Sequence, residues 1–581
     1  MIREFVITAE NPAVRAQILP VSSQDGIDLY RVEIDTPEGM PLSPVKIEWE
    51  EEMYDTLSIW APQLKRNRQM KQWFLPTVNQ STFYSGAPIL TTVGAENKNA
   101  LTVAVSDVCT PTEIAYWIKD LDEQDKLGYS VSFFTGNCSW VGHYTAEIRI
   151  DNRRVPYYEA IPAVSRWWEK DCGYTFLPMP PAAEDALYSS WYSFHQAPKD
   201  DLLLKDLELA AEMGMKTVIL DDGWQFPGPS SGTYSECGTW QMSPDKFADF
   251  KTFVRKVHEL GMKIMVWFCV PFVGINSPVF KQFEGKYLYV EYGIMECGTL
   301  DPRYPEVRDY IKNTYKQFLK DYDIDGFKLD FIDSFKPGDL TADYHSGMAY
   351  ETVEEAVHTL LDEIVAELGE IKPDLLYEYR QGYVGPAINH YGNMLRVGDC
   401  AYDALTNRIG TVDLRLMDYP VAVHADMLLW GKQETPEMCA RQLLNILFSV
   451  PQISVRLAEV PEEHRRLVKA YVDYWTANRD VLLHGKFMPV QPELNYTAVT
   501  AEGENKTITV LYASQPYTFT GKACDVFVCG EESGLIFENP TENALTAEIF
   551  DCFGTLLETR TVAADTIVRL PVPRTGRVGV C

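Results

Sequence analysis

Lys328 and Asp330 stand two residues apart in an otherwise largely apolar segment, residues 324–333. Side chains of a β-strand alternate between its two faces, so both charged groups would lie on the same face. A neighbouring ammonium group keeps a carboxylate ionised at neutral pH. Asp330 is therefore a candidate nucleophile. The alternative is a structural ion pair at the end of a strand, and the rest of the chain has to decide between the two.

Two adjacent carboxylates, Asp221 and Asp222, end another strand-like segment, residues 216–224. Adjacent carboxylates repel each other and need cations or hydrogen-bond donors, which the hydroxyl groups of a sugar could supply. A simple turn is the alternative for this pair.

A further carboxylate, Asp399, ends the segment of residues 394–400. Two carboxylates on different strands suit the hydrolysis of a glycoside. One of them attacks the anomeric carbon or activates water, and the other, in a drier setting, protonates the leaving oxygen. We predict that Asp399 is this acid/base. An ion pair of Asp399 with Arg396 or Arg408 is the alternative.

The segments that carry these residues belong to a regular alternation of strands and amphipathic helices. Strands are predicted at residues 186–196, 216–224, 263–270, 326–332, 375–380, 394–400, 421–428 and 452–457. Helices are predicted between them, except that the helix between strands five and six is missing or very short. Eight such units in about 300 residues are typical of a (β/α)₈ barrel, whose chemistry lies at the C-terminal strand ends.

Short alternating strands flank the barrel on both sides. We predict a multidomain protein of the α/β and all-β classes, in which a central TIM barrel at 181–485 follows an N-terminal β-sandwich domain at 1–180. An antiparallel, sandwich-like β-domain follows the barrel at 486–581.

The bulk composition limits the partners. The 581 residues include 83 acidic and 52 basic ones, a net charge of -31. This excess argues against nucleic acid and anionic membranes and favours a neutral small-molecule ligand. The twelve cysteines show no metal-binding spacing and indicate free thiols. The N-terminus lacks a secretory pattern, and no apolar run approaches ~18 residues. We predict a cytoplasmic protein, in which homo-oligomerisation is possible.

The strand ends resemble the α-galactosidases of glycoside hydrolase family 36, in clan D. The matching pieces occur in the family's order, and they are Ser190-Trp191-Tyr192, Asp221-Asp222-Gly223-Trp224, Lys328-Leu329-Asp330 and Gly398-Asp399-Cys400, followed by Asp403 and Arg408. The resemblance implies a retaining mechanism without a metal or organic cofactor, with Asp330 as nucleophile and Asp399 as acid/base. In that case their carboxyl groups should lie about 5–5.5 Å apart.

The resemblance also implies the contacts to a galactose ring. Asp221 and Asp222 would bind O4 and O6, and Lys328 a ring hydroxyl. Trp191 and Trp267 would form walls, and Arg380 would reach toward O2 or the nucleophile. Trp60 is a possible counterpart of a tryptophan that the family's N-terminal domain adds to the pocket, with a position in the core as the alternative.

The fifth strand departs from the family, because residues 377–383 replace a Cys-Ser-Ser-Gly-Gly-Gly-Arg run. The choice between galactose and N-acetylgalactosamine therefore stays open. We predict a retaining exo-acting α-galactosidase. The alternatives are an α-N-acetylgalactosaminidase, a galactosyltransferase of the raffinose-synthase kind and a non-catalytic galactoside-binding protein. A metal-dependent barrel hydrolase is a further alternative, with ligands from His195, His424, Asp426 and Asp222.

Overall fold

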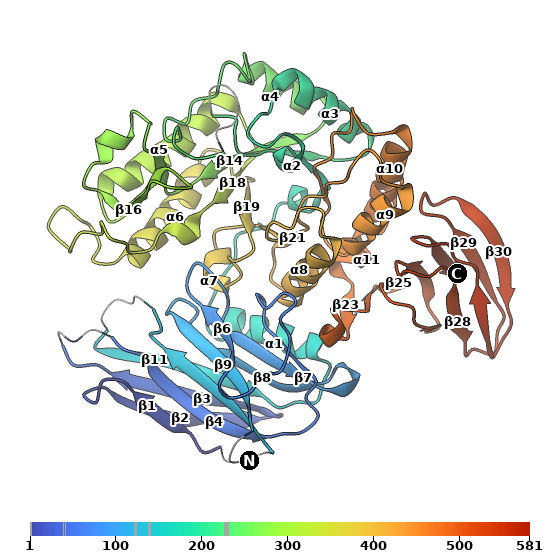
Figure 1. The fold of residues 1–581 in the computed structure, drawn as a ribbon, viewed down its shortest axis with the longest axis horizontal. Helices are drawn as coiled ribbons and strands as arrows, with labels where there is room; N and C mark the ends of the chain where they lie inside the picture. The colour runs from blue at the N-terminus through green and yellow to red at the C-terminus, as the bar shows by residue number, and fades with distance from the viewer. Residues whose placement is uncertain are drawn as a thin grey trace.

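The computed structural model describes residues 3–38, 40, 42–120, 125–136, 141–225 and 232–580. At its centre lie eight parallel strands, as predicted (Figure 1). In chain order they are β12 (Leu187–Ser189), β13 (Thr217–Leu220), β14 (Lys263–Cys269), β18 (Gly326–Asp330), β19 (Leu376–Arg380), β20 (Met394–Arg396), β21 (Ala422–His424) and β22 (Gln452–Ile453). The last strand, β22, pairs with the first, and a bridge between His424 and Val450 closes the ring.

Helices separate the strands and bury one face each against the barrel. They are α3 (Asp200–Glu212), α4 (Phe250–Glu259), α5 (Pro305–Tyr322), α6 (Val353–Gly369), α8 (Ala404–Leu416), α9 (Pro436–Asn445) and α10 (Glu462–Ala477). The start of α4 shows why a helix begins there. The Asp249 carboxylate caps the helix by accepting a hydrogen bond from the Thr252 N–H at 3.0 Å. Between β19 and β20 stands only the short α7 (Pro386–Asn389), which confirms the prediction of a missing or very short helix.

A small sheet that the sequence pattern did not reveal follows β14. Its strands are β15 (Phe272–Gly274), β16 (Tyr287–Glu291) and β17 (Cys297–Leu300), with β17 in the middle. The Phe272 ring lies 4.8 Å from the ring of Phe331, the residue directly after β18. This sheet therefore supports the C-terminal end of the barrel, where the strand-end residues gather.

The N-terminal part is a sandwich of two antiparallel sheets, drawn in blue below the barrel in Figure 1. One sheet has the order β1 (Val6–Ala9), β4 (Val45–Glu52), β10 (Lys126–Phe133), β9 (Thr112–Lys119) and β6 (Thr77–Ser81). The other has the order β2 (Arg15–Gln24), β3 (Ile27–Asp35), β11 (His143–Asp151), β8 (Asn99–Val105), β7 (Ile89–Val93) and β5 (Ser58–Trp60). Alternate residues such as Val45, Ile47 and Trp49 point into the core between them.

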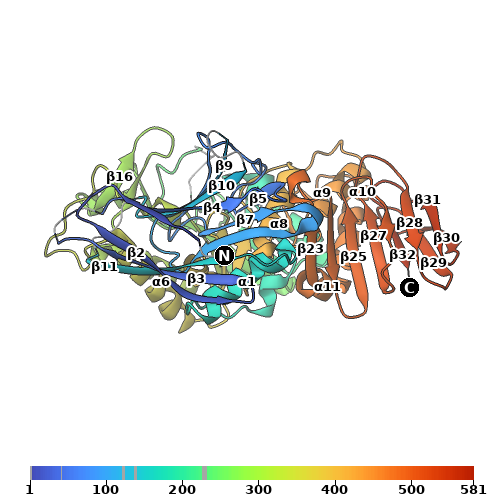
Figure 2. The same ribbon diagram turned by 90° about the horizontal axis from the view of Figure 1, so that it is seen from below.

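The C-terminal part is also built of sheets and lies at one end of the molecule (Figure 2). Seven strands have the order β23 (Lys486–Val490), β24 (Ala498–Glu502), β25 (Lys506–Leu511), β27 (Ala523–Val528), β32 (Arg577–Val580), β29 (Leu545–Phe550) and β30 (Leu556–Val562). A smaller sheet has the order β26 (Tyr517–Thr518), β28 (Leu535–Asn539) and β31 (Thr566–Leu570). Most pairs are antiparallel, but β25 and β27 pair in parallel, as do β26 and β28.

One buried carboxylate joins the three parts. Asp413 on α8 is 1% exposed and pairs with Arg68 of the N-terminal sandwich at 2.7 Å. It also accepts hydrogen bonds from Trp60 Nε1 at 2.9 Å and from the hydroxyl of Tyr496 in the C-terminal part. The domain limits at 180/181 and 485/486 stay a prediction. Within the described residues, every helix is too short or too polar to cross a membrane.

Candidate active site

A pocket of about 330 Å³ opens at the C-terminal ends of the barrel strands. Every predicted site residue except Trp60 lines it. Its lining consists of Lys65, Trp191, Asp221, Asp222, Tyr234, Trp267, Lys328, Asp330, Phe331, Arg380, Gln381, Arg396, Gly398 and Asp399. Residues from the ends of strands one to six thus meet as the barrel geometry requires, although their individual roles stay predictions.

Asp330 ends β18, and three donors hold its carboxylate. Arg380 Nε donates to Oδ1 at 2.6 Å, and Trp267 Nε1 donates to Oδ2 at 3.2 Å. The third donor is the Phe331 N–H, 2.8 Å from Oδ1. Burial acts to raise the pKa of Asp330, but the charges of Arg380 and Lys328 outweigh it and leave this pKa below its usual value. The carboxylate is therefore ionised at neutral pH, as a nucleophile must be.

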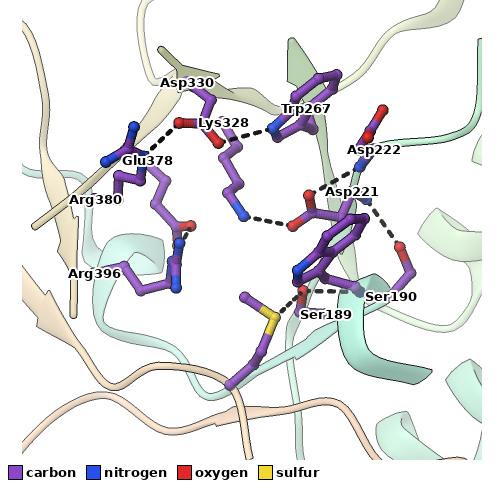
Figure 3. A network of polar contacts seen from close by, with 12 residues as sticks. Ser189, Ser190, Asp221, Asp222, Trp267, Lys328, Asp330, Glu378, Arg380 and Arg396 are labelled. Atoms are coloured by element: carbon purple, nitrogen blue, oxygen red, sulfur yellow. Dashed lines mark hydrogen bonds and ion pairs between the residues drawn. The ribbon is translucent and has the colours of Figure 1, made fainter. Parts of the chain in front are cut away.

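The contact partner of Lys328 differs from the expected one. Lys328 Nζ donates to Asp221 Oδ2 at 2.6 Å (Figure 3). Both side chains are almost completely buried. The structural alternative, a direct ion pair between Lys328 and Asp330, is not what the structure shows, because Arg380 of the adjacent strand pairs with Asp330. Lys328 still acts on Asp330 through its charge at longer range.

Asp222 is held by two amide side chains instead of a cation. Gln196 Nε2 donates to it at 2.7 Å and Gln225 Nε2 at 2.8 Å. Burial raises the pKa of Asp222 to about 6, against the effect of these hydrogen bonds. The protein itself thus supplies partners to both aspartates, while both still face the pocket.

Asp399 stands on the open side of the pocket, with 61% of its side chain exposed. Its Oδ1 lies 2.9 Å from Arg396 Nη1. Partial burial acts to raise the pKa of Asp399, but the charge of Arg396 lowers it overall. The prediction that the acid/base candidate Asp399 lies in a setting with little water is therefore wrong. Arg408, the other suggested partner, donates instead to Asn445 Oδ1 at 3.1 Å and to the Asn495 carbonyl.

Glu378 stands where the fifth strand departs from the family pattern, and it lies beside Lys328 and Arg396 (Figure 3). The strand register pairs Lys328 with Glu378, whose carboxylate has no exposed surface. Its Oε1 lies 3.6 Å from Arg396 Nε, and its Oε2 accepts a hydrogen bond from Gln452 Nε2 at 2.5 Å. Burial raises the pKa of Glu378, whereas the charges of Lys328 and Arg396 act to lower it.

Trp60 does not belong to the pocket. It is completely buried at the end of β5, where its indole N–H donates to Asp413. The position in the core, which was the alternative for this residue, is the one that the structure shows. The loop that follows β5 instead contributes Lys65 to the pocket.

Lys65, Tyr234, Phe331 and Gln381 line the pocket without having been predicted. Phe331 and Gln381 directly follow predicted site residues, so the strand ends could have suggested them. Tyr234 stacks on Trp267 with ring centroids 6.0 Å apart. It lies in the long segment between β13 and α4, where no periodic pattern marks it. Lys65 belongs to the N-terminal sandwich, so the spacing of residues within the barrel could not predict that it lines the pocket.

The residues of the metal-site alternative have other partners. In the described ranges, no three or more His, Cys, Asp or Glu side chains form a group that could hold a metal ion. His424 is buried with its Nε2 2.7 Å from the Ala183 carbonyl oxygen, and Asp426 accepts hydrogen bonds from Arg396 and from the Tyr192 hydroxyl. The arrangement gives no support to a metal centre built from these residues.

Comparison with known proteins identifies relatives of the barrel. The family model described as Melibiase matches residues 183–388. The α-galactosidase Mel36A of Lactobacillus acidophilus is 27% identical over 201 residues, which are 33% of this chain and 26% of the relative. The A type blood α-D-galactosamine galactosaminidase of Flavonifractor plautii is 27% identical over 132 residues, 22% of this chain and 11% of the relative. The alignment thus spans about a quarter or less of these relatives.

Solved structures share the fold over nearly the whole chain. A variant of the family 36 α-galactosidase AgaA of Geobacillus stearothermophilus, in complex with raffinose, superposes with a TM-score of 0.64 at 13% identity. This superposition covers 98% of this chain and 81% of AgaA. The galactosidase domain of AgaSK gives a TM-score of 0.62 at 13% identity, with 98% and 81% covered. Residues 183–388 are thus similar to the Melibiase family, and the chain as a whole shares the fold of the family 36 α-galactosidases.

Proposed function

We propose that the protein is a retaining, exo-acting α-galactosidase. The observation that carries this proposal is the ionised Asp330, held by Arg380 and Trp267 in the same pocket as Asp399. A pocket of about 330 Å³, at the small end of ligand sites, suits one terminal sugar ring more than the middle of a chain. The raffinose in the AgaA structure supports an α-linked oligosaccharide as the substrate class.

The reaction takes place in two displacements. In the first, an Asp330 oxygen bonds to the anomeric carbon while the bond to the leaving oxygen breaks, and Asp399 gives that oxygen its proton. In the second, Asp399 takes a proton from water, the water oxygen bonds to the anomeric carbon, and the bond to Asp330 breaks. Both carboxyl groups return to their starting states, and two inversions give net retention.

Asp399 must carry a proton in the first step, although Arg396 favours its ionised form. A bound sugar and leaving group remove water from the exposed carboxyl group, and desolvation favours protonation. Asp221, Asp222 and Lys328 bind the ring hydroxyls in this proposal. Trp191 and Trp267 provide the aromatic walls.

A panel of nitrophenyl α-glycosides that differ only in the sugar tests the proposal. We expect hydrolysis of the α-galactoside, with β-galactoside as a negative control, and release of α-galactose as the first product by NMR. An activated fluoro-galactoside should label Asp330, as peptide mass spectrometry would show. Inactivity on all α-glycosides, together with no labelling, would refute an enzymatic role and leave a galactoside-binding protein.

The same panel separates the alternatives that share this scaffold. A preference for the N-acetylgalactosaminide would favour an α-N-acetylgalactosaminidase. Galactosylated sucrose formed on addition of sucrose would favour a transferase. We also propose a cytoplasmic location, which is supported by free thiols such as those of the buried Cys237, Cys269 and Cys439.

A further inference from the structure

A loop of the N-terminal sandwich, residues 61–68, is fastened to the barrel. Gln381 Nε2 donates to the Pro62 carbonyl at 3.1 Å, beside the pocket. Arg66 pairs with Asp403 at the start of α8 at 2.7 Å, and Arg68 pairs with the buried Asp413 farther along α8, also at 2.7 Å. The loop is thus held on both sides of Lys65, which lies between these contacts.

Two of the three basic residues in this loop attach it to the barrel, and the third enters the pocket. Lys65 lines the pocket with a backbone φ of +51°, a left-handed conformation that is uncommon for lysine. Its carbonyl accepts a hydrogen bond from Arg68 Nε at 2.9 Å, which helps to fix this conformation. Strained residues that the surrounding structure holds in place cluster at functional sites.

Lys65 differs from the other cations of the pocket, because it has no acidic partner among the described residues. The other three are paired at 2.6 to 2.9 Å, namely Lys328 with Asp221, Arg380 with Asp330 and Arg396 with Asp399. No ion pair or hydrogen bond of the Lys65 ammonium group is found within the part of the chain that the structure describes. Acidic residues far outnumber basic ones in this protein, whose net charge is -31. An unpaired cation among the described residues of the pocket is therefore free to bind an anionic ligand.

Lys65 also lies on the side of the pocket that faces solvent. Of the fourteen lining residues, only Lys65 and Asp399 are exposed, whereas the nucleophile Asp330 is only 13% exposed at its side chain. An acid/base lies beside the leaving oxygen, so the leaving group occupies the side of Asp399. The Lys65 ammonium group, on that side, would contact the leaving group, whereas the buried lining residues would contact the galactose ring.

We propose that Lys65 binds a negatively charged leaving group, so that the preferred substrates are α-galactosides whose leaving group carries a carboxylate or a phosphate ester. This inference rests on the proposed function and adds to it the chemical class of the leaving group. The binding is an ion pair at an exposed site, so its expected contribution to kcat/KM is about two- to fivefold.

The test uses two α-galactosides that differ in charge alone at one position, those of 3-hydroxybenzoate and 3-hydroxybenzamide. We expect the full-length protein to give a kcat/KM ratio of benzoate to benzamide about two to five times the ratio given by Lys65→Gln. Lys65→Arg should restore the preference. The control Lys170→Gln removes an exposed lysine of α1 (Tyr157–Lys170), away from the pocket, and should leave the ratio unchanged. Salt should reduce the preference, since it screens exposed charges.

A second pair, galactosylglycerol with and without a terminal phosphate, distinguishes the two anions. The larger charge preference identifies carboxylate or phosphate as the group that Lys65 binds. Ratios that Lys65→Gln leaves unchanged in both pairs would overturn the inference while hydrolysis itself upheld the proposed function. No hydrolysis of any of the four glycosides would overturn the proposed function and this inference with it.

Discussion

Arg380 Nε lies 2.6 Å from Asp330 Oδ1, although 50 positions separate the two residues in the chain. Parallel pairing of β18 with β19 brings them together at the C-terminal end of the barrel. The Arg380 guanidinium is also 5.1 Å from the ring centroid of Tyr383 and 5.6 Å from that of Phe331. The cation that keeps Asp330 ionised is therefore held in place by its own neighbours.

Replacing Arg380 by methionine removes this cation and keeps much of the side-chain volume. Burial would then act on Asp330 with less opposition, so we expect its pKa to rise by about 1–3 units. As the proposed nucleophile, Asp330 must be ionised to attack, so the acidic limb of the kcat/KM profile should move to higher pH by the same amount. The profile of hydrolysis against pH measures the shift.

Arg255→Met is a matched control for this variant. Arg255 forms an exposed pair with Glu259 on α4 and does not line the pocket. The control should leave the acidic limb in place. If Arg380→Met lowers kcat but leaves the limb unmoved, Arg380 does not set the ionisation of Asp330.

Asp330→Asn should abolish turnover while the fold persists. The amide oxygen can still accept hydrogen bonds from Arg380 and from the Phe331 N–H, but it cannot form a stable bond to the anomeric carbon. We expect kcat to fall by more than about a thousandfold. Circular dichroism and thermal unfolding check the fold, and near-normal activity would eliminate Asp330 as the nucleophile.

The strand ends could be predicted because the barrel fold itself brings them together. Eight alternating segments indicate a barrel, and every barrel strand delivers its C-terminal residue to one face. Asp221, Asp330 and Asp399 are therefore found in one pocket, although they lie far apart in the chain. The order of the strands and the residue types at their ends are enough to predict this shared pocket, and no side-chain contact has to be known.

The partners of these residues could not be predicted in the same way. Alternation along one strand suggested Lys328 as the partner of Asp330, but pairing between strands decides the contact and selects Arg380. The exposure of Asp399 depends on loops around the pocket, which no periodic pattern describes. Trp60 and Lys65 stand five positions apart, yet one enters the core and the other the pocket, because long-range contacts fix the loop between them.

Asp399→Ala should separate the two chemical steps. Loss of the acid slows the cleavage of a galactoside with a poor leaving group by about 10²–10⁴-fold. A dinitrophenyl galactoside needs no proton on its leaving oxygen, so its first step should persist and the glycosyl-enzyme should accumulate. Burst kinetics measure this accumulation.

Azide provides the decisive check on Asp399. An anion that needs no general base can replace water in the second step, so azide should restore turnover and give α-galactosyl azide. Equal losses for both leaving groups, without rescue by azide, would show that Asp399 is not the acid/base.

Asp413→Ala should destabilise the whole molecule, because Asp413 joins its three parts. The change would leave Arg68, which is 4% exposed, without its ion-pair partner. It would also remove the acceptor for Trp60 Nε1 and the Tyr496 hydroxyl. Breaking a buried pair in this way costs about 3–5 kcal/mol of the free energy of unfolding. Urea denaturation measures the loss.

Asp403→Ala is the matched control for Asp413→Ala, because Asp403 pairs with Arg66 of the same loop. Both members of that pair are about half exposed, at 45% and 51%. The exposed pair contributes about 0–1 kcal/mol, and Asp403 also caps the start of α8 through the Thr406 N–H at 3.0 Å, a contact that adds about 1 kcal/mol. The loss on Asp413→Ala should therefore be the larger of the two. Equal losses would mean that the buried Asp413–Arg68 pair contributes no more to the free energy of unfolding than the exposed Asp403–Arg66 pair does.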